Sequence, residues 1–149
     1  MKLLEVSGLK VRFWTSDREV QAVKGLNFHL DAGEILGIVG ESGSGKSQSV
    51  LSILGLLADN GTASGSANFC GQNLLALPEA KLRKIRGKRI SMVFQDPMTS
   101  LNPYLTIAGQ MTQALRQHKK LSGKAAREHC VKMLEAVKIP DARKCFDRY

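Results

Sequence analysis

One stretch of the chain combines glycines, a lysine and a serine at a spacing that can bind phosphate. The run Gly40-Glu41-Ser42-Gly43-Ser44-Gly45-Lys46-Ser47 fits the pattern Gly-x4-Gly-Lys-Ser/Thr without a mismatch. Its glycines allow dihedral angles that turn consecutive N–H groups toward one point, which makes a concave anion site. The Lys46 ammonium can reach phosphate oxygens, and the Ser47 hydroxyl can ligate Mg²⁺. The pattern therefore predicts a nucleotide phosphate site that uses Mg²⁺.

The segments on either side of this loop have the composition that such a site needs. Residues 35–39 are apolar and predict a buried strand at 34–39, whereas residues 48–57 predict a helix. The N-terminus of that helix adds roughly half a positive charge, which also favours phosphate. We include Gln48, at the start of the helix, in the predicted binding set. A glycine-rich surface turn that matches by chance is the alternative, and the agreement of strand, loop and helix argues against it.

Composition limits the class of protein. A length of 149 residues suits one domain with a core, and no apolar run approaches the ~20 residues that span a bilayer. The N-terminus lacks the apolar region of a signal peptide, so we expect a cytosolic location that leaves attachment to a membrane partner open. The three cysteines, Cys70, Cys130 and Cys145, are far apart and odd in number, which predicts reduced thiols.

The formal charge is +9, from 22 Lys and Arg against 13 Asp and Glu. Basic residues concentrate at residues 81–89 and 116–124. Such clusters can attract nucleic acid, anionic lipid or nucleotide. Aromatic residues do not interleave with either cluster, so no nucleic-acid partner is expected, and a solvated helix face is the favoured interpretation.

The rest of the chain predicts strands first and helices later. Periodicity and turn residues predict strands at 2–13, 20–30, 67–70 and 90–94, loops at 14–19 and 59–66, and helices at 78–86, 107–118 and 123–137. Ser122 is expected to cap the last helix, and residues 97–103 to be irregular. An antiparallel opening followed by a phosphate-loop strand and helices indicates α/β architecture with a β appendage.

A second motif limits the families to which this chain can belong. Neither Asp-x-x-Gly nor Asn-Lys-x-Asp occurs, which argues against a GTPase. The segment Met92-Val93-Phe94-Gln95-Asp96-Pro97-Met98-Thr99-Ser100-Leu101-Asn102-Pro103, together with the phosphate loop, resembles the ATP-binding subunits of ABC transporters. The closest likeness is to the oligopeptide/dipeptide and nickel importer group, and it runs along nearly the whole chain.

The resemblance implies an α/β fold with a P-loop NTPase core of the ABC ATPase type, an N-terminal antiparallel β subdomain and part of a helical subdomain. We expect the β subdomain at about residues 1–33, the core at 34–95 and the start of the helical subdomain at 96–149. The expected fold is incomplete. The sequence lacks the family's signature loop, its Walker B aspartate with the following glutamate, and its switch histidine. Residues 121–123 match the start of the signature, but Lys124 does not continue it. We therefore expect an N-terminal fragment that ends before the signature.

The resemblance also assigns roles to single residues. Gln95 matches the glutamine that contacts Mg²⁺ and the attacking water, so Lys46 and Gln95 are the expected catalytic residues, and Ser47 and Gln95 the Mg²⁺ ligands. Phe13 aligns with the aromatic residue that stacks on adenine; Trp14 competes for this role, and packing within the β subdomain is the alternative for Phe13. Ala22 lies where the family places a small residue against adenine.

By resemblance, the full-length subunit binds ATP with Mg²⁺ and hydrolyses it at a dimer interface with a second ATP-binding subunit. Hydrolysis would drive import of peptides or a related small solute through permease subunits, at the cytoplasmic face of the membrane. The fragment itself is expected to show little turnover. Two rivals stay open: a nucleotide-binding regulatory or structural module without hydrolysis, and a soluble ABC-type ATPase that acts on nucleic acid.

The segment at residues 34–39 has a consequence for stability. It is apolar on both faces, as a central parallel strand is, and by resemblance the Walker B strand would lie beside it. Without that neighbour the strand exposes an unpaired edge. We therefore expect this chain to be oligomeric or poorly stable as a monomer.

Overall fold

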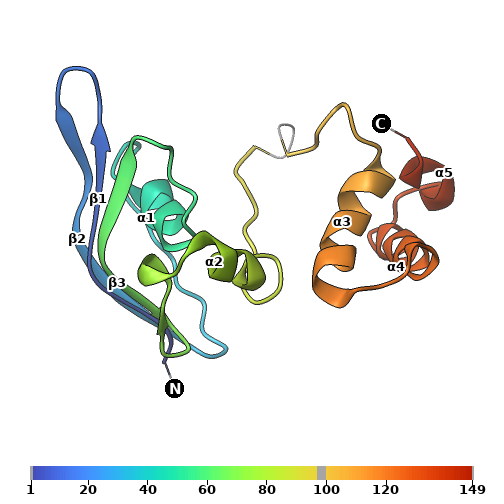
Figure 1. Ribbon diagram of the computed structural model, residues 1–149, viewed down its shortest axis with the longest axis horizontal. Coiled ribbons are helices and arrows are strands. Elements are labelled where there is room, and N and C mark those ends of the chain that lie inside the picture. Colours follow the sequence, from blue (N-terminus) through green and yellow to red (C-terminus); the bar gives the residue numbers. More distant parts are fainter. Residues whose placement is uncertain (1, 97–99, 149) are drawn as a thin grey trace. The chain divides into compact units, whose positions relative to one another are not determined.

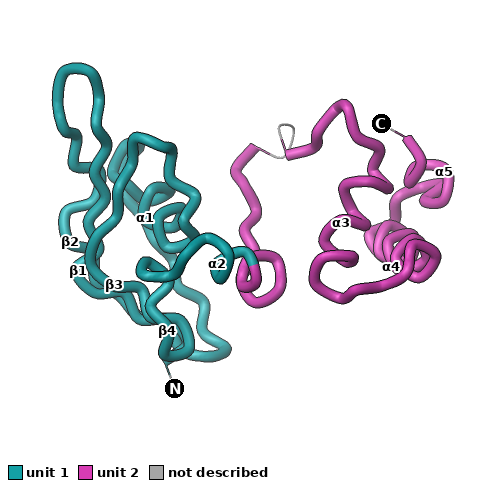
Figure 2. The backbone as a smooth tube through the Cα atoms, in the orientation of Figure 1, with its two compact units in different colours: residues 1–83 teal, residues 84–149 magenta. Residues whose placement is uncertain are grey.

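The computed structural model describes residues 2–96 and 100–148 of the chain. The chain divides into two compact units, Met1–Arg83 and Lys84–Tyr149, which Figure 2 colours teal and magenta. Each unit has its own buried side chains and is described by itself. No helix in the described ranges is long and apolar enough to cross a bilayer.

The first unit is built on a four-stranded antiparallel sheet. Its strands are β1 (Lys2–Trp14), β2 (Glu19–Asp31), β3 (Gly61–Phe69) and β4 (Gln72–Asn73), in the order β2-β1-β3-β4. The long β1–β2 hairpin agrees with the strands predicted at residues 2–13 and 20–30, and Figure 1 shows it beside β3. Alternation of apolar and polar residues specifies which face of this hairpin is buried.

Apolar side chains from sheet and helices form the core of this unit. Val6, Leu9 and Val11 of β1 and Ala67 of β3 are almost fully buried. The helix α1 (Lys46–Ile53) contributes Ile53, and the short η1 turn (Leu74–Ala76) and helix α2 (Glu79–Ile85) add buried leucine side chains. The helices predicted at residues 48–57 and 78–86 are therefore present with shifted ends, as is usual for helix boundaries.

The loop predicted at residues 59–66 is wrong for most of its length, because Gly61–Phe69 forms β3. The glycines that contributed to the loop prediction instead permit close approach to β1. A Cβ atom at Gly61 would lie 2.6 Å from Cε1 of Phe13, and one at Gly65 would lie 2.5 Å from the carbonyl oxygen of Gly8. Backbone pairing with β1 therefore outweighs the local preference of these residues.

The strands predicted at residues 34–39 and 90–94 are also wrong. Both segments are irregular apart from an isolated bridge between Arg86 and Ile90, and neither belongs to the described sheet. Ile35 is 96 % exposed, Val39 93 % and Val93 92 %. An apolar segment becomes a buried strand only when neighbouring strands pair with it. The described residues supply no such neighbour, so these side chains remain in solvent.

The second unit contains the helices α3 (Ile107–Lys119), α4 (Gly123–Ala136) and α5 (Ala142–Phe146). The helices predicted at residues 107–118 and 123–137 are confirmed, as is the Ser122 cap, whose hydroxyl accepts a hydrogen bond from the Ala125 N–H at 3.4 Å. The predicted irregular segment, residues 97–103, lies partly outside the described residues. The helix α5 was not predicted.

A small core joins these three helices. Cys130 and Val131 of α4 pack with Ala142 and Phe146 of α5, and all four are buried. Arg127 lies over the Phe146 ring at 5.0 Å from its centroid and binds both carboxylate oxygens of Asp147, at 2.7 and 2.5 Å. The guanidinium lowers the pKa of Asp147 by hydrogen bonding. The pair fixes α5 against α4 at the surface of this unit.

The cysteines should react with thiol reagents at very different rates. Burial raises the pKa of the Cys130 thiol, whereas Cys70 is exposed. Because the thiolate is the reactive form, we expect iodoacetamide to label Cys70 at least ~10-fold faster than Cys130 at pH 8. Mass spectrometry of native and urea-unfolded samples measures both rates. Equal labelling of the two residues in the native chain would show that the α4–α5 core is open.

Candidate phosphate-binding site

The glycine-rich loop leads directly into α1. Gly45 is the N-cap residue of this helix, with φ of 90°, and Gly43 has φ of 81°. Residues with a Cβ atom adopt these left-handed dihedral angles only at a cost. These left-handed dihedral angles explain why glycine occupies both positions. The two glycines let the loop turn sharply before the helix begins.

The loop lies against strand β2. A Cβ atom at Gly45 would be 2.3 Å from the carbonyl oxygen of Ala22 and 3.2 Å from Cγ2 of Val23. Only a glycine permits the two backbones to approach so closely. The structure thus brings together Ala22 and Gly45, two residues of the predicted site that are far apart in sequence.

The Lys46 side chain folds back over the loop. Its ammonium donates hydrogen bonds to the carbonyl oxygens of Gly40, at 2.7 Å, and Glu41, at 2.6 Å, and lies 3.4 Å from Oγ of Ser44. These contacts place a full positive charge within the loop. They also tie the first residues of the loop to the first residue of α1.

The first turn of α1 can donate to an anion. Its N-cap residue offers no side-chain hydrogen bond, and its first turn contains no acidic residue. The N–H groups at a helix start otherwise need a partner, and together with the helix dipole they favour negative charge. Ser47 is exposed in this turn, whereas the buried Ser49 donates its hydroxyl to the Gly45 carbonyl at 3.0 Å. The Lys46 ammonium and the uncapped turn are therefore neighbouring groups whose charge and free donors suit an anion.

An open hollow of about 760 Å³ adjoins the loop, which is within the range of small-molecule sites. It is lined by Val20, Gln21, Ala22, Val23, Lys24, Gly25, Leu26, Ile38, Val39, Gly40, Gly43, Ser44, Lys46 and Ser49. Among the residues of β2, the sequence predicted only Ala22 as part of the site. The neighbours of Ala22 were missed because a strand residue beside a loop carries no local signal of its own.

Phe13, with Trp14 as its competitor, and Gln95 were also predicted as site residues. Phe13 is half-buried against Gly61 and is not among the residues that line the hollow, while Trp14 is 56 % exposed. Gln95 is exposed in an irregular segment of the second unit, whereas Ser47 belongs to the first unit. The roles of Phe13 and Gln95 therefore stay predictions.

Comparison with known proteins gives consistent relatives. The chain is 55 % identical over 147 residues to the oligopeptide transport ATP-binding protein OppD of Escherichia coli K12, and 45 % identical over 150 residues to OppD of Bacillus subtilis 168. These alignments cover 99 % of this chain but only 44 % and 42 % of the relatives, so the chain spans less than half their length.

Solved structures show the same fold. The dimeric ABC transporter cassette MJ0796 matches with a TM-score of 0.79 at 23 % identity, over 98 % of this chain and 60 % of that one. A second MJ0796 structure, described as bound to ADP and Pi, matches with a TM-score of 0.77 at 24 % identity. The fold expected from the sequence is therefore confirmed as that of an incomplete ABC ATPase cassette, although the parallel strands of its core are irregular here.

A family model agrees with both comparisons. The model described as ABC transporter matches residues 23–147, which include the phosphate loop, α1 and all three helices of the second unit. The chain belongs to the ABC transporter family.

Proposed function

We propose that this chain binds ATP together with Mg²⁺ at the loop from Gly40 to Ser47. The observation that carries the proposal is the convergence of the Lys46 ammonium and the uncapped first turn of α1 on one loop. Backbone N–H groups at a helix start bind phosphate oxygens well, and the lysine adds a point charge. The hollow beside β2 offers room for the remainder of a nucleotide.

The residues at the loop also fit Mg²⁺. The cation prefers hard oxygen ligands and usually keeps several waters, so the exposed Ser47 hydroxyl suits it, and the Gln95 carbonyl is the second protein ligand that we propose. When bound, Mg²⁺ would neutralise charge on the phosphates. The chain's own contribution is to bind and orient the phosphates through Lys46 and the amides of the loop.

We further propose that a full-length subunit with this sequence hydrolyses ATP to drive import of peptides or a related small solute. The support is the identity to proteins named oligopeptide transport and peptide import ATP-binding proteins. Permease subunits and a second ATP-binding subunit are the partners that we propose, at the cytoplasmic face of the membrane. Dimer formation is described for the MJ0796 cassette, which shares the fold.

Changing Gln95 to alanine tests the catalytic part of this proposal. In the full-length protein, Gln95→Ala should leave ATP-analogue affinity within ~2-fold and lower Mg²⁺-dependent ATPase turnover at least ~10-fold, because the lost amide acts on metal and water rather than on nucleotide binding. Gln117→Ala, which removes an exposed glutamine from α3, is the control and should change neither quantity. Normal turnover in Gln95→Ala would refute the proposed role.

A further inference from the structure

The net charge of the chain belongs entirely to one unit. Residues 1–83 carry eight basic and eight acidic side chains, whereas residues 84–149 carry 14 basic and five acidic ones. The first unit is therefore neutral overall, and the second carries the whole charge of +9. Phosphate binding at Lys46 does not explain this asymmetry, because the loop lies in the neutral unit.

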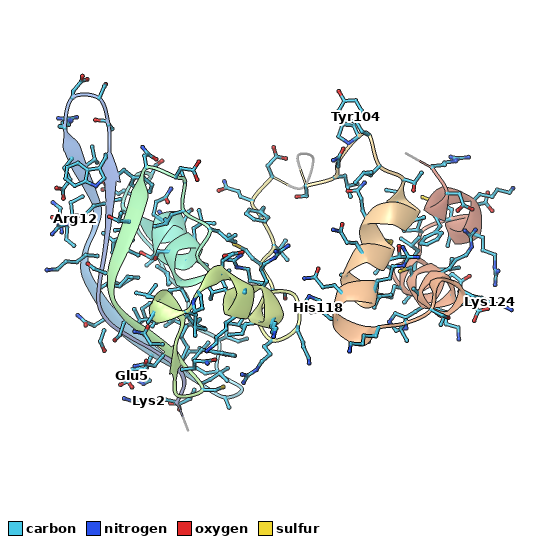
Figure 3. All side chains as sticks on the ribbon, in the orientation of Figure 1. Lys2, Glu5, Arg12, Tyr104, His118 and Lys124 are labelled. Carbon is cyan, nitrogen blue, oxygen red and sulfur yellow. The ribbon has the colours of Figure 1, made fainter. Side chains whose placement is uncertain are left out.

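Part of this charge gathers at the connection between α3 and α4. No Asp or Glu occurs from residue 97 to residue 127 of the sequence. Within that range Arg116 and Lys119 end α3, Lys120 follows as its C-cap residue, and Lys124 lies in the first turn of α4. We call these four residues the α3–α4 basic surface. Figure 3 labels His118 and Lys124, which lie just before and just after the connection.

The geometry holds these cations together at one end of the helix pair. Lys120 adopts φ of 52°, which turns the chain back so that Ser122 can cap α4. The Arg116 guanidinium reaches over this turn, since a Cβ atom at Gly123 would lie 3.8 Å from its Nη2. The start of α4 brings the positive end of its helix dipole here and the end of α3 brings the negative end of its own, so the net charge at this place comes from the four side chains.

All four side chains are exposed, and within residues 100–148 none of them forms an ion pair. Within the same residues, Arg127 pairs with Asp147 and Lys144 with Asp141. Like charges that flank one short connection repel one another, so an anionic partner would gain by neutralising them. Cations without such a partner would more commonly alternate with acids along a helix.

We infer that the α3–α4 basic surface contacts the anionic phospholipids of a bilayer. This rests on the proposed function for its membrane setting. Three of the four residues are lysines, whose hydrated point charges suit a diffuse lipid surface better than bidentate phosphate recognition. None of them alternates with aromatic residues that could stack on bases, which disfavours single-stranded nucleic acid. Each basic residue near an anionic bilayer contributes on the order of fivefold in binding.

Vesicle flotation tests the inference with the 149-residue chain. The probes are vesicles of phosphatidylcholine alone and of phosphatidylcholine mixed with phosphatidylglycerol. We expect binding only to the mixed vesicles, and we expect the variant Arg116→Gln, Lys119→Gln, Lys120→Gln, Lys124→Gln to lose at least ~10-fold in binding. Raising ionic strength from about 0.1 M to 1 M should weaken wild-type binding strongly, because the Debye length falls from about 10 to 3 Å.

A matched variant removes four exposed cations from the first unit: Lys10→Gln, Arg18→Gln, Lys81→Gln, Arg83→Gln. It changes net charge equally and should keep vesicle binding within ~2-fold. Equal loss in both variants, or equal binding to both kinds of vesicle, would overturn the inference. Loss of duplex DNA binding without loss of vesicle binding would overturn it in favour of nucleic acid.

Two further measurements keep the outcomes separate. The far-UV circular dichroism spectrum of the α3–α4 variant should match that of the wild type, because all four side chains are exposed. If the two spectra differ, the double variant Lys119→Gln, Lys120→Gln is used in place of the fourfold variant. This double variant should lose at least ~5-fold in vesicle binding. ATP-analogue binding should be unchanged in every variant. A chain that binds these vesicles but no nucleotide would refute the proposed function and leave the inference standing.

Discussion

Replacing Lys46 with alanine is expected to abolish ATP-analogue binding by this chain, with a loss of affinity of at least ~100-fold. The variant removes the charge that the loop encloses and the hydrogen bonds to the carbonyl oxygens of Gly40 and Glu41. A nucleotide then loses its strongest direct partner, and the loop loses the tie that holds its first residues near α1. Titration with a fluorescent ATP analogue in the presence of Mg²⁺ measures the effect.

Lys24→Ala is the matched control for this experiment. Lys24 lines the same hollow but belongs to β2 rather than to the loop. The Lys24→Ala change therefore removes one positive charge, as Lys46→Ala does, but leaves the proposed contacts between the loop and the phosphates in place. We expect at most a ~3-fold loss of affinity. Thermal unfolding of both variants separates loss of binding from loss of folding. Unchanged affinity in Lys46→Ala, or an equal loss in Lys24→Ala, would contradict the assignment of the loop.

Gly45→Ala should be strongly damaging although it adds only one methyl group to the first unit. A Cβ atom there would lie 2.3 Å from the Ala22 carbonyl oxygen, and the residue has φ of 90°. Backbone strain and the clash act together, so we expect the free energy of unfolding to fall by about 2–4 kcal/mol and ATP-analogue affinity to fall at least ~10-fold. Urea denaturation and the analogue titration measure the two effects.

The variant Gly33→Ala introduces backbone strain without the steric clash that is expected in Gly45→Ala. Gly33 has φ of 81° but would place its Cβ atom with nothing within 4 Å, and it lies outside the phosphate loop. We expect a loss of about 1 kcal/mol in stability and no change in nucleotide affinity. Similar losses of stability in both variants would show that the close approach of the loop to β2 has little energetic weight.

The sequence predicted those elements whose signals are local. The hairpin of β1 and β2 follows from alternating residues around a polar turn, and α3 and α4 follow from helical spacing, with Ser122 as the cap of α4. The phosphate loop was likewise predictable, because its function depends on residues that are consecutive in the chain. The left-handed angles of Gly43 and Gly45 are the physical basis of that pattern.

The misses share a cause, since each depends on distant residues. The strand β3 was hidden by glycine and serine, and it exists because β1 pairs with it. Residues 34–39 and 90–94 have the composition of buried strands but lack a described neighbour, so composition alone misled the prediction. In the site, the close approach of Gly45 to Ala22 is a tertiary contact that no local sequence pattern predicts.

The irregular approach to the phosphate loop bears on how nucleotide affinity should be interpreted. Among the described residues, no backbone hydrogen bond joins residues 35–39 to a neighbouring strand, so the loop is anchored through α1 and its contact with β2. Fixing the backbone of one residue costs about 1–2 kcal/mol in entropy. A ligand that orders this segment must offset that cost before any affinity is observed. Measured affinity therefore reports preorganisation of the segment as well as phosphate contacts, and a nucleotide would act on this chain partly as a folding ligand.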